Sequence, residues 1–148
     1  MTGTTETYVS PIPEPFTFIP PEHRSITLPD GSITSSFLDL FGRPARDTGM
    51  ESERNNNITA AQRLHMLNSG HIQGKIENGP GLHPLMDGRR RPAEVASDLY
   101  LTILSRYPTE EEIRIVEAYV NSGADGRHEA AVDVAWALIN SDEFLYRH

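Results

Sequence analysis

The chain has 148 residues, of which 37% are hydrophobic and 23% charged, and its formal net charge is −8. A chain of this length can bury a core, and no apolar run approaches the ~20 residues that a transmembrane helix needs. The acidic excess argues against a nucleic-acid partner, because phosphate groups require a basic surface. The absence of cysteine excludes disulfides, thiolate nucleophiles, iron–sulfur clusters and covalent c-type haem on this chain.

The N-terminal part of the chain differs from the rest because it is rich in proline. Proline removes a backbone donor and favours extended geometry in its predecessor, so this segment is expected to form an extended, polyproline-like arm. The first ten residues, MTGTTETYVS, have neither a basic start nor an apolar stretch and do not resemble a signal peptide. The prolines between Thr7 and Pro29 are Pro11, Pro13, Pro15, Pro20, Pro21 and Pro29.

Two short elements are expected after the arm. In SITLPDGSIT, residues 25–34, apolar and polar residues alternate on both sides of Pro-Asp-Gly, which favours a short β-hairpin. The segment FLDLFG, residues 37–42, is expected to form a single helical turn, with the preceding Ser36 as its candidate cap and Gly42 as its end.

A helical period begins near Asn57. Asn57 is a plausible N-cap for a helix that ends at Ser69-Gly70, and a second short helix is expected over 71–77. The segment NGPGLHPLMDGRRRP, residues 78–92, is expected to be a long loop. Its three arginines, Arg89 to Arg91, fit either a solvated turn or a docking site for an anion or a partner.

The C-terminal part carries the clearest helical signals. Pro92 stands at a first-turn position, Thr109 and Glu112 form a capping box, and Gly123 is a helix stop. A third helix follows Gly123, and a short final helix begins at Asn140 or Ser141. Trp136 is the expected shared anchor of the core.

These patterns predict a mainly α fold: a small helical bundle with a Pro-rich extended N-terminal arm and a short hairpin. Single helices of this length do not compensate for the entropy of ordering their backbones, so they must pack together. We expect the helices of residues 57–77 to share one core with the three C-terminal helices. The expected division is residues 1–35 for the arm and hairpin and residues 36–148 for the helical domain.

The tripeptide Asp47-Thr48-Gly49 is the signature of an aspartic protease. A catalytic Asp-Thr-Gly needs apolar flanks and a second carboxylate at close range. Here the flanks are RPAR and MESERNNN, no second copy occurs, and the remainder of the chain is helical in pattern. The tripeptide is therefore interpreted as a plain turn.

Other catalytic and metal-binding patterns are missing from the sequence. It contains neither a G-x-S-x-G nucleophile elbow nor a phosphate-binding glycine loop with its lysine. No pair of histidines has the helical ligand spacing of H-E-x-x-H, so no metal or other cofactor is predicted. The histidines are His23, His65, His71, His83, His128 and His148.

Residues 29–148 contain an ordered set of short motifs that resembles a known family. The motifs are FLDLFGRP, a following MESER, LHMLNS, LYLTILSRYPTEEEI and the terminal WALINSDEFLYRH. Together they resemble the C-terminal domain of unknown function in large planctomycete-type proteins that also carry a cytochrome c-like region. The family's two cysteines correspond to Met50 and Ser52 here, so any metal or redox role of those positions is absent.

The resemblance implies a non-catalytic structural or interaction module within a larger exported assembly, acting on other domains of a longer protein or on a protein partner. Its alternative is an accessory part of a redox or polysaccharide-degrading enzyme whose active groups lie elsewhere. Relatives continue upstream of the position of Met1, so the chain is expected to be an N-terminally truncated member. The sequence indicates no compartment.

The residues that follow FGRP form the candidate contact cluster. Their charges of both signs predict an ion-pair network that fastens the N-terminal arm to the helical core, with a groove for an anionic or sugar-like ligand as the alternative. The cluster consists of Arg43, Arg46, Asp47, Glu51, Glu53 and Arg54.

Overall fold

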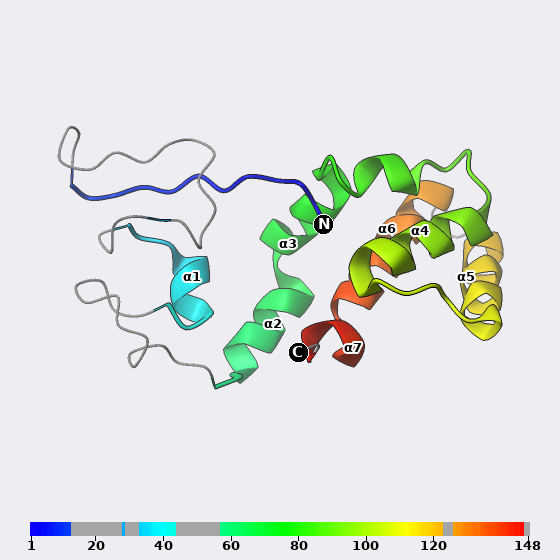
Figure 1. Ribbon diagram of the computed structural model, residues 1–148. Helices are drawn as coiled ribbons and strands as arrows, with labels where there is room; N and C mark the ends of the chain where they lie inside the picture. The colour runs from blue at the N-terminus through cyan, green and yellow to red at the C-terminus, as the bar shows by residue number, and fades with distance from the viewer. Residues whose placement is uncertain (13–27, 29–32, 44–56, 123–125, 147–148) are drawn as a thin grey trace. The chain divides into compact units, whose positions relative to one another are not determined.

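A computed structural model describes residues 1–12, 28, 33–43, 57–122 and 126–146. Within these ranges the chain is mainly helical, which confirms the predicted fold class (Figure 1). The helices are α1 (Ser36–Leu40), α2 (Ala60–Asn68), α3 (Gly70–Asn78), the 3₁₀ helix η3 (His83–Met86), α4 (Pro92–Leu104), α5 (Glu110–Ser122), α6 (Arg127–Ile139) and α7 (Asp142–Leu145).

The chain divides into two compact units. The C-terminal unit contains Met1–Thr4 and Ser69–His148, and the N-terminal unit contains Thr5–Asn68. From their helical spacing, α2 and α3 are predicted to share one core with the C-terminal helices. The division separates them at the Ser69 break, and α2 buries none of its residues.

The core of the C-terminal unit is built around α4. Helix α4 packs against both α5 and α6, and α3 and η3 also pack against α6 (Figure 1). Each of α4 and α6 contributes an apolar stripe to this interior, as their helical spacing predicts. The largest fully buried side chains are Ile76, Leu82, Met86, Leu99 and Leu104.

Trp136 is not the anchor of this core. Its side chain is only half-buried on α6, whereas Ala135 and Leu138 on the same helix are buried. Position 136 is one residue, about 100°, beyond the inward-facing position 135, and so it falls at the edge of the buried stripe. Aliphatic side chains from several elements fill the centre instead.

The helix ends follow the predicted capping chemistry. Pro92 occupies the first turn of α4. The Thr109 N–H donates to Glu112 Oε2 at 2.7 Å and the Glu112 N–H donates to Thr109 Oγ1 at 3.3 Å, which confirms the capping box of α5. Ser141 begins α7 by accepting the Phe144 N–H. The predicted stop at Gly123 lies outside the described residues.

The segment expected to be a loop, residues 78–92, is partly ordered into the core. It forms η3, and both Leu82 and Met86 are fully buried. These two apolar residues are four positions apart, a spacing that a single helical turn brings to one face. The expectation of a loop is therefore wrong for residues 83–86, which form η3.

The first four residues lie against the turn that precedes η3. The Gly81 N–H donates to the Thr2 carbonyl at 2.8 Å, and Lys75 Nζ donates to Thr4 Oγ1 at 2.9 Å. A Cβ atom on Gly81 would collide with the Met1 carbonyl oxygen, so this close approach requires glycine. Nothing in the sequence pattern predicted this contact.

The caps of the N-terminal unit differ by one or two residues from the predictions. Ser35, not Ser36, caps α1 by accepting the Leu38 N–H at 3.3 Å. Thr59, not Asn57, begins α2, because Thr59 and Gln62 exchange reciprocal bonds of 2.9 and 3.2 Å. Gly42 ends α1 with a φ of 85°, as predicted.

The arm and the hairpin are only partly described. Thr34 pairs with Val9 in an isolated antiparallel bridge, with the Thr34 N–H donating to the Val9 carbonyl at 3.0 Å. Most of the predicted hairpin, residues 25–34, and most of the Pro-rich stretch lie outside the described residues.

Candidate functional site

The predicted contact cluster is represented by Arg43 alone. Arg43 Nη1 donates to the Ile33 carbonyl at 2.5 Å, and its backbone N–H donates to the Leu38 carbonyl at 2.9 Å. Arg43 therefore ties the end of α1 to the residue three positions before that helix. The other members, Arg46, Asp47, Glu51, Glu53 and Arg54, lie outside the described residues, so the network stays a prediction.

Two arginines of the predicted docking loop are paired with carboxylates on α4. Arg90 Nη2 lies 2.6 Å from Asp98 Oδ2, and Arg91 Nε donates to Glu94 Oε1 at 2.8 Å. The hydrogen bond from Arg91 lowers the pKa of Glu94 below its ordinary value. The pairing offsets the positive charge of this loop and weakens the case for an anion site.

An open hollow of about 380 Å³ lies over these pairs. Its lining mixes both signs of charge, with Arg90 and Arg91 facing three carboxylates, those of Glu94, Asp98 and Glu117. A polyanion would meet the carboxylates as well as the arginines, so the lining disfavours one.

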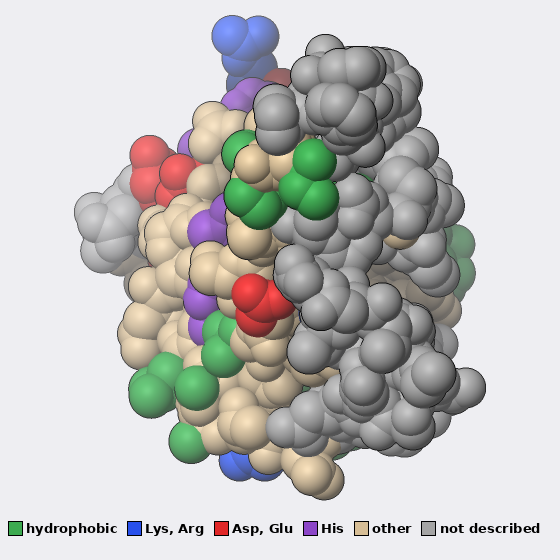
Figure 2. Space-filling model, turned by 90° about the vertical axis from the view of Figure 1, so that its left-hand side faces the viewer, with side chains coloured by type: hydrophobic (Ala, Val, Ile, Leu, Met, Phe, Trp, Pro, Cys, Tyr) green, Lys and Arg blue, Asp and Glu red, His purple; other side chains and the backbone are tan. Residues whose placement is uncertain are grey.

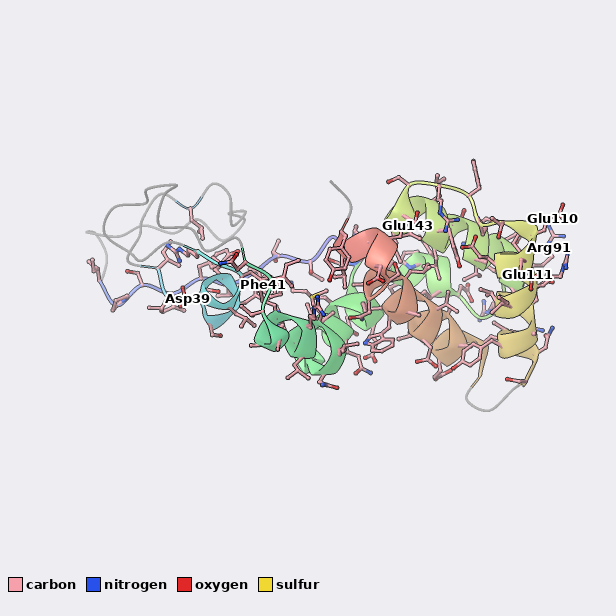
Figure 3. The ribbon with its side chains drawn as sticks, turned by 90° about the horizontal axis from the view of Figure 1, so that it is seen from below. Asp39, Phe41, Arg91, Glu110, Glu111 and Glu143 are labelled. Carbon is pink, nitrogen blue, oxygen red and sulfur yellow. The ribbon has the colours of Figure 1, made fainter. Side chains whose placement is uncertain are left out.

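The densest polar cluster among the described residues is the Arg106 junction, formed by Arg106, Glu112 and Glu143. Arg106 Nη1 and Nη2 donate to the two oxygens of Glu112 at 2.9 and 2.8 Å. Nε and Nη2 of the same guanidinium donate to the two oxygens of Glu143 at 2.7 and 2.8 Å. Glu143 stands on α7, as Figure 3 shows, and Glu112 in the first turn of α5.

The junction perturbs the ionisation of its members in the direction that favours charge. The hydrogen bonds from Arg106, and secondarily that from the Thr109 backbone, lower the pKa of Glu112 from 4.5 to about 2. Hydrogen bonds to both carboxylates raise the pKa of Arg106. The guanidinium carbon also lies 5.2 Å from the centre of the Tyr100 ring. Burial, before all other causes, raises the pKa of the Tyr100 hydroxyl.

The ion pairs of the Arg106 junction hold the surrounding helices in place. A general acid near neutral pH needs a raised carboxyl pKa, and that of Glu112 is lowered. Both carboxylates are engaged by one guanidinium in bidentate geometry, which fixes orientation. The junction joins the α4–α5 connection to the start of α5 and to α7.

The described residues include two histidines whose rings meet. The ring centres of His83 and His128 are 5.7 Å apart and their planes are tilted by 69°. His83 comes from η3 and His128 from the first turn of α6. Within the described ranges, no group of three or more His, Cys, Asp or Glu side chains is placed to hold a metal ion.

Several large apolar side chains of the C-terminal unit face solvent. Ile115 and Tyr119, four residues apart on α5, are 59% and 47% exposed, and we call this pair the α5 ridge. The Tyr119 hydroxyl donates to Asp133 Oδ2 at 2.6 Å, which orients the ring across α5 toward α6. Figure 2 shows a different face of the molecule from the one that carries α5, and on it the hydrophobic side chains of the described residues form small separate groups.

Sequence reasoning found Glu112 only as a helix cap and did not find its partners. Arg106 and Glu143 are far apart in the chain, and no local pattern couples them. His83 and His128 were considered singly, because a spacing rule detects ligands on one helix only. None of the helices formed by the described residues is both long enough and apolar enough to cross a bilayer.

Comparisons of the chain with protein-family models, with curated proteins and with solved structures gave no match.

Proposed function

We propose that this chain is a non-catalytic helical module that binds a protein partner or another domain of a larger assembly. The resemblance of residues 29–148 to the C-terminal region of planctomycete-type, cytochrome-associated proteins supports this proposal. The single observation that carries it is the α5 ridge, an apolar and aromatic pair exposed on a well-packed helical unit.

The packing of α5 explains why the ridge counts as a surface feature. Val116 is the buried residue of α5, and Ile113 and Val120 lie half-buried on the same side. Ile115 and Tyr119 flank this buried stripe, one and three residues from Val116, and their side chains remain largely exposed. Exposed aromatic and aliphatic anchors of this kind are typical of protein interfaces.

The charged groups support an interaction role over a reaction. Those of the Arg106 junction hold helices together, and Arg90 and Arg91 are paired with α4. Hydrogen bonds from their arginine partners lower the pKa of Glu94 and that of Glu112, which favours the ionised carboxylates. Chemistry at such groups would first have to break the contacts that stabilise the fold.

A site-specific crosslinking experiment tests the proposal. A photoreactive phenylalanine analogue replaces Ile115 in the full chain, produced in its native host. A matched variant carries the same analogue at Asn121, an exposed polar position on α5. We expect one discrete protein adduct from position 115 and none from position 121. Equal adduct patterns from the two positions, or no adduct from either, would contradict the proposed role of the ridge.

A further inference from the structure

The two histidines that meet in the C-terminal unit have the same hydrogen-bonding arrangement. His83 Nδ1 lies 2.9 Å from the Glu77 carbonyl oxygen, and His128 Nδ1 lies 2.9 Å from the Met86 carbonyl oxygen. A carbonyl oxygen can only accept, so each Nδ1 is the donor and carries the proton. In the neutral ring, Nε2 then presents a lone pair.

This arrangement is the one that prepares an imidazole to bind a metal. Metal-bound histidines donate their second ring N–H to a carbonyl or carboxylate, which fixes the tautomer and the orientation of the ring. Both rings meet this condition through backbone atoms, which cannot rotate away as side chains do. The hydrogen bond recorded for each ring is the one made by Nδ1.

The supports of the two rings are rigid. His83 follows Leu82, and the carbonyl that holds His128 belongs to Met86, and both of these residues are fully buried. Helix α6 anchors His128 from the other side through the buried Ala131 and Val132. The pair therefore links two elements that the core already fixes, so little ordering is left to occur on binding.

The separation of the ring centres leaves room for a shared ion. Metal–nitrogen bonds of about 2.0–2.1 Å, with each nitrogen about 1 Å from its ring centre, place two ring centres around one ion roughly 5–6 Å apart. The observed separation of the centres is 5.7 Å.

We infer that His83 and His128 form a two-histidine site for a divalent transition metal of the Zn²⁺, Ni²⁺ or Cu²⁺ class. Imidazole nitrogen suits these ions and not Mg²⁺ or Ca²⁺, which require oxygen ligands. Water completes the coordination. The affinity for the ion is expected to be moderate, because the protein supplies only two ligands and the positively charged Arg127 is the neighbour of His128 in the chain. The affinity should be higher for Cu²⁺ than for Ni²⁺ or Zn²⁺.

The test is a calorimetric titration of the full chain with ZnCl₂ and, separately, with MgCl₂. The variants are His83→Gln and His128→Gln, and the matched control is His71→Gln, which removes an exposed histidine from α3 of the same unit. We expect one Zn²⁺ per chain, no heat from Mg²⁺, and binding at least about tenfold weaker in either site variant. The control variant should bind as the wild type does.

A second measurement needs no variant. In ¹H–¹³C spectra of the wild-type chain, the ring resonances of His83 and His128 should shift together and saturate at one equivalent of Zn²⁺. The inference is overturned if Zn²⁺ does not bind, if only one of the two rings responds, or if His71→Gln weakens binding as much as the site variants. Two rings that merely pack against each other would give one of these results.

Discussion

In the C-terminal unit, α4 and α6 each bury six residues, whereas the described helices of the N-terminal unit, α1 and α2, bury none. The short N-terminal helices are held by end caps and by ring contacts, such as Phe37 with Phe41 at 4.7 Å and Phe37 with His65 at 5.5 Å. The difference shows that a helical period alone does not reveal what stabilises a helix. Among the described helices, α4 and α6 therefore depend on a shared interior, whereas α1 and α2 are held by end caps and ring contacts.

Truncation of a core leucine should give the largest effect. Leu99→Ala removes a side chain with 0% exposure from the centre of α4 and should lower the free energy of unfolding by about 2–5 kcal/mol. The matched change in the N-terminal unit is Leu67→Ala, at a position 44% exposed on α2, with an expected loss below about 1 kcal/mol. Urea denaturation measures both. Equal losses would remove the contrast between the units.

A glycine pair tests the contact made by the first four residues. Gly81→Ala places a methyl group against the Met1 carbonyl and should destabilise the C-terminal unit by about 1–3 kcal/mol. Gly74→Ala, in the interior of α3 with no atom within 4 Å of the new Cβ, should stabilise it by about 0.5–1 kcal/mol. Thermal melts should show a lower melting temperature for Gly81→Ala and a higher one for Gly74→Ala. If deleting residues 1–3 fails to relieve Gly81→Ala, the strain lies elsewhere.

The Arg106 junction should contribute less than the core. Arg106→Ala breaks both bidentate pairs, and because the side chain is 35% exposed we expect only about 1–2 kcal/mol. Arg114→Ala, which removes the exposed pairs with Glu110 and Glu111, should cost no more than about 0.5 kcal/mol. Chemical denaturation of the two variants compares a network with isolated surface pairs. Similar losses of unfolding free energy would show that the junction stabilises the fold no more than exposed surface ion pairs do.

The smallest expected effect is a pH dependence. The pKa of Glu112 is about 2 in the folded chain against an ordinary 4.5, so its stabilising contribution is complete above pH 4.5 and is lost as the pH falls toward 2. The difference in unfolding free energy between the wild type and Arg106→Ala should therefore narrow over that window. Denaturation at several pH values measures it. A difference that stays constant from pH 6 to pH 2 would contradict the lowered pKa.

Local signals in the sequence predicted much of the C-terminal unit. Pro92, the Thr109–Glu112 capping box and the apolar stripe through Leu99 depend on neighbours within one helix, and the structure confirms each of them. The caps of α1 and α2 were misplaced because several adjacent polar residues, such as Asn57 and Thr59, compete for one cap position. Only the tertiary structure selects between them.

The contacts between separate elements are not encoded by any local pattern. The Arg106 junction, the His83–His128 ring contact and the hydrogen bond from Gly81 to Thr2 each join residues from different segments. The spacing of apolar residues likewise did not reveal that Leu82 and Met86 enter the core. The Gly and Pro residues around them are typical of loops, and they obscured the short helical turn. The predicted cluster after FGRP is described only at Arg43 and stays a prediction.

Native-state hydrogen exchange of the full chain compares α4 and α6, which each bury six residues, with α1 and α2, which bury none. We expect amides in the middle of α4 and α6, such as those of Leu99 and Ala135, to exchange only through global unfolding. Amides of α1 and α2 should exchange through local opening at a lower free energy. Equal protection in all four helices would contradict the account.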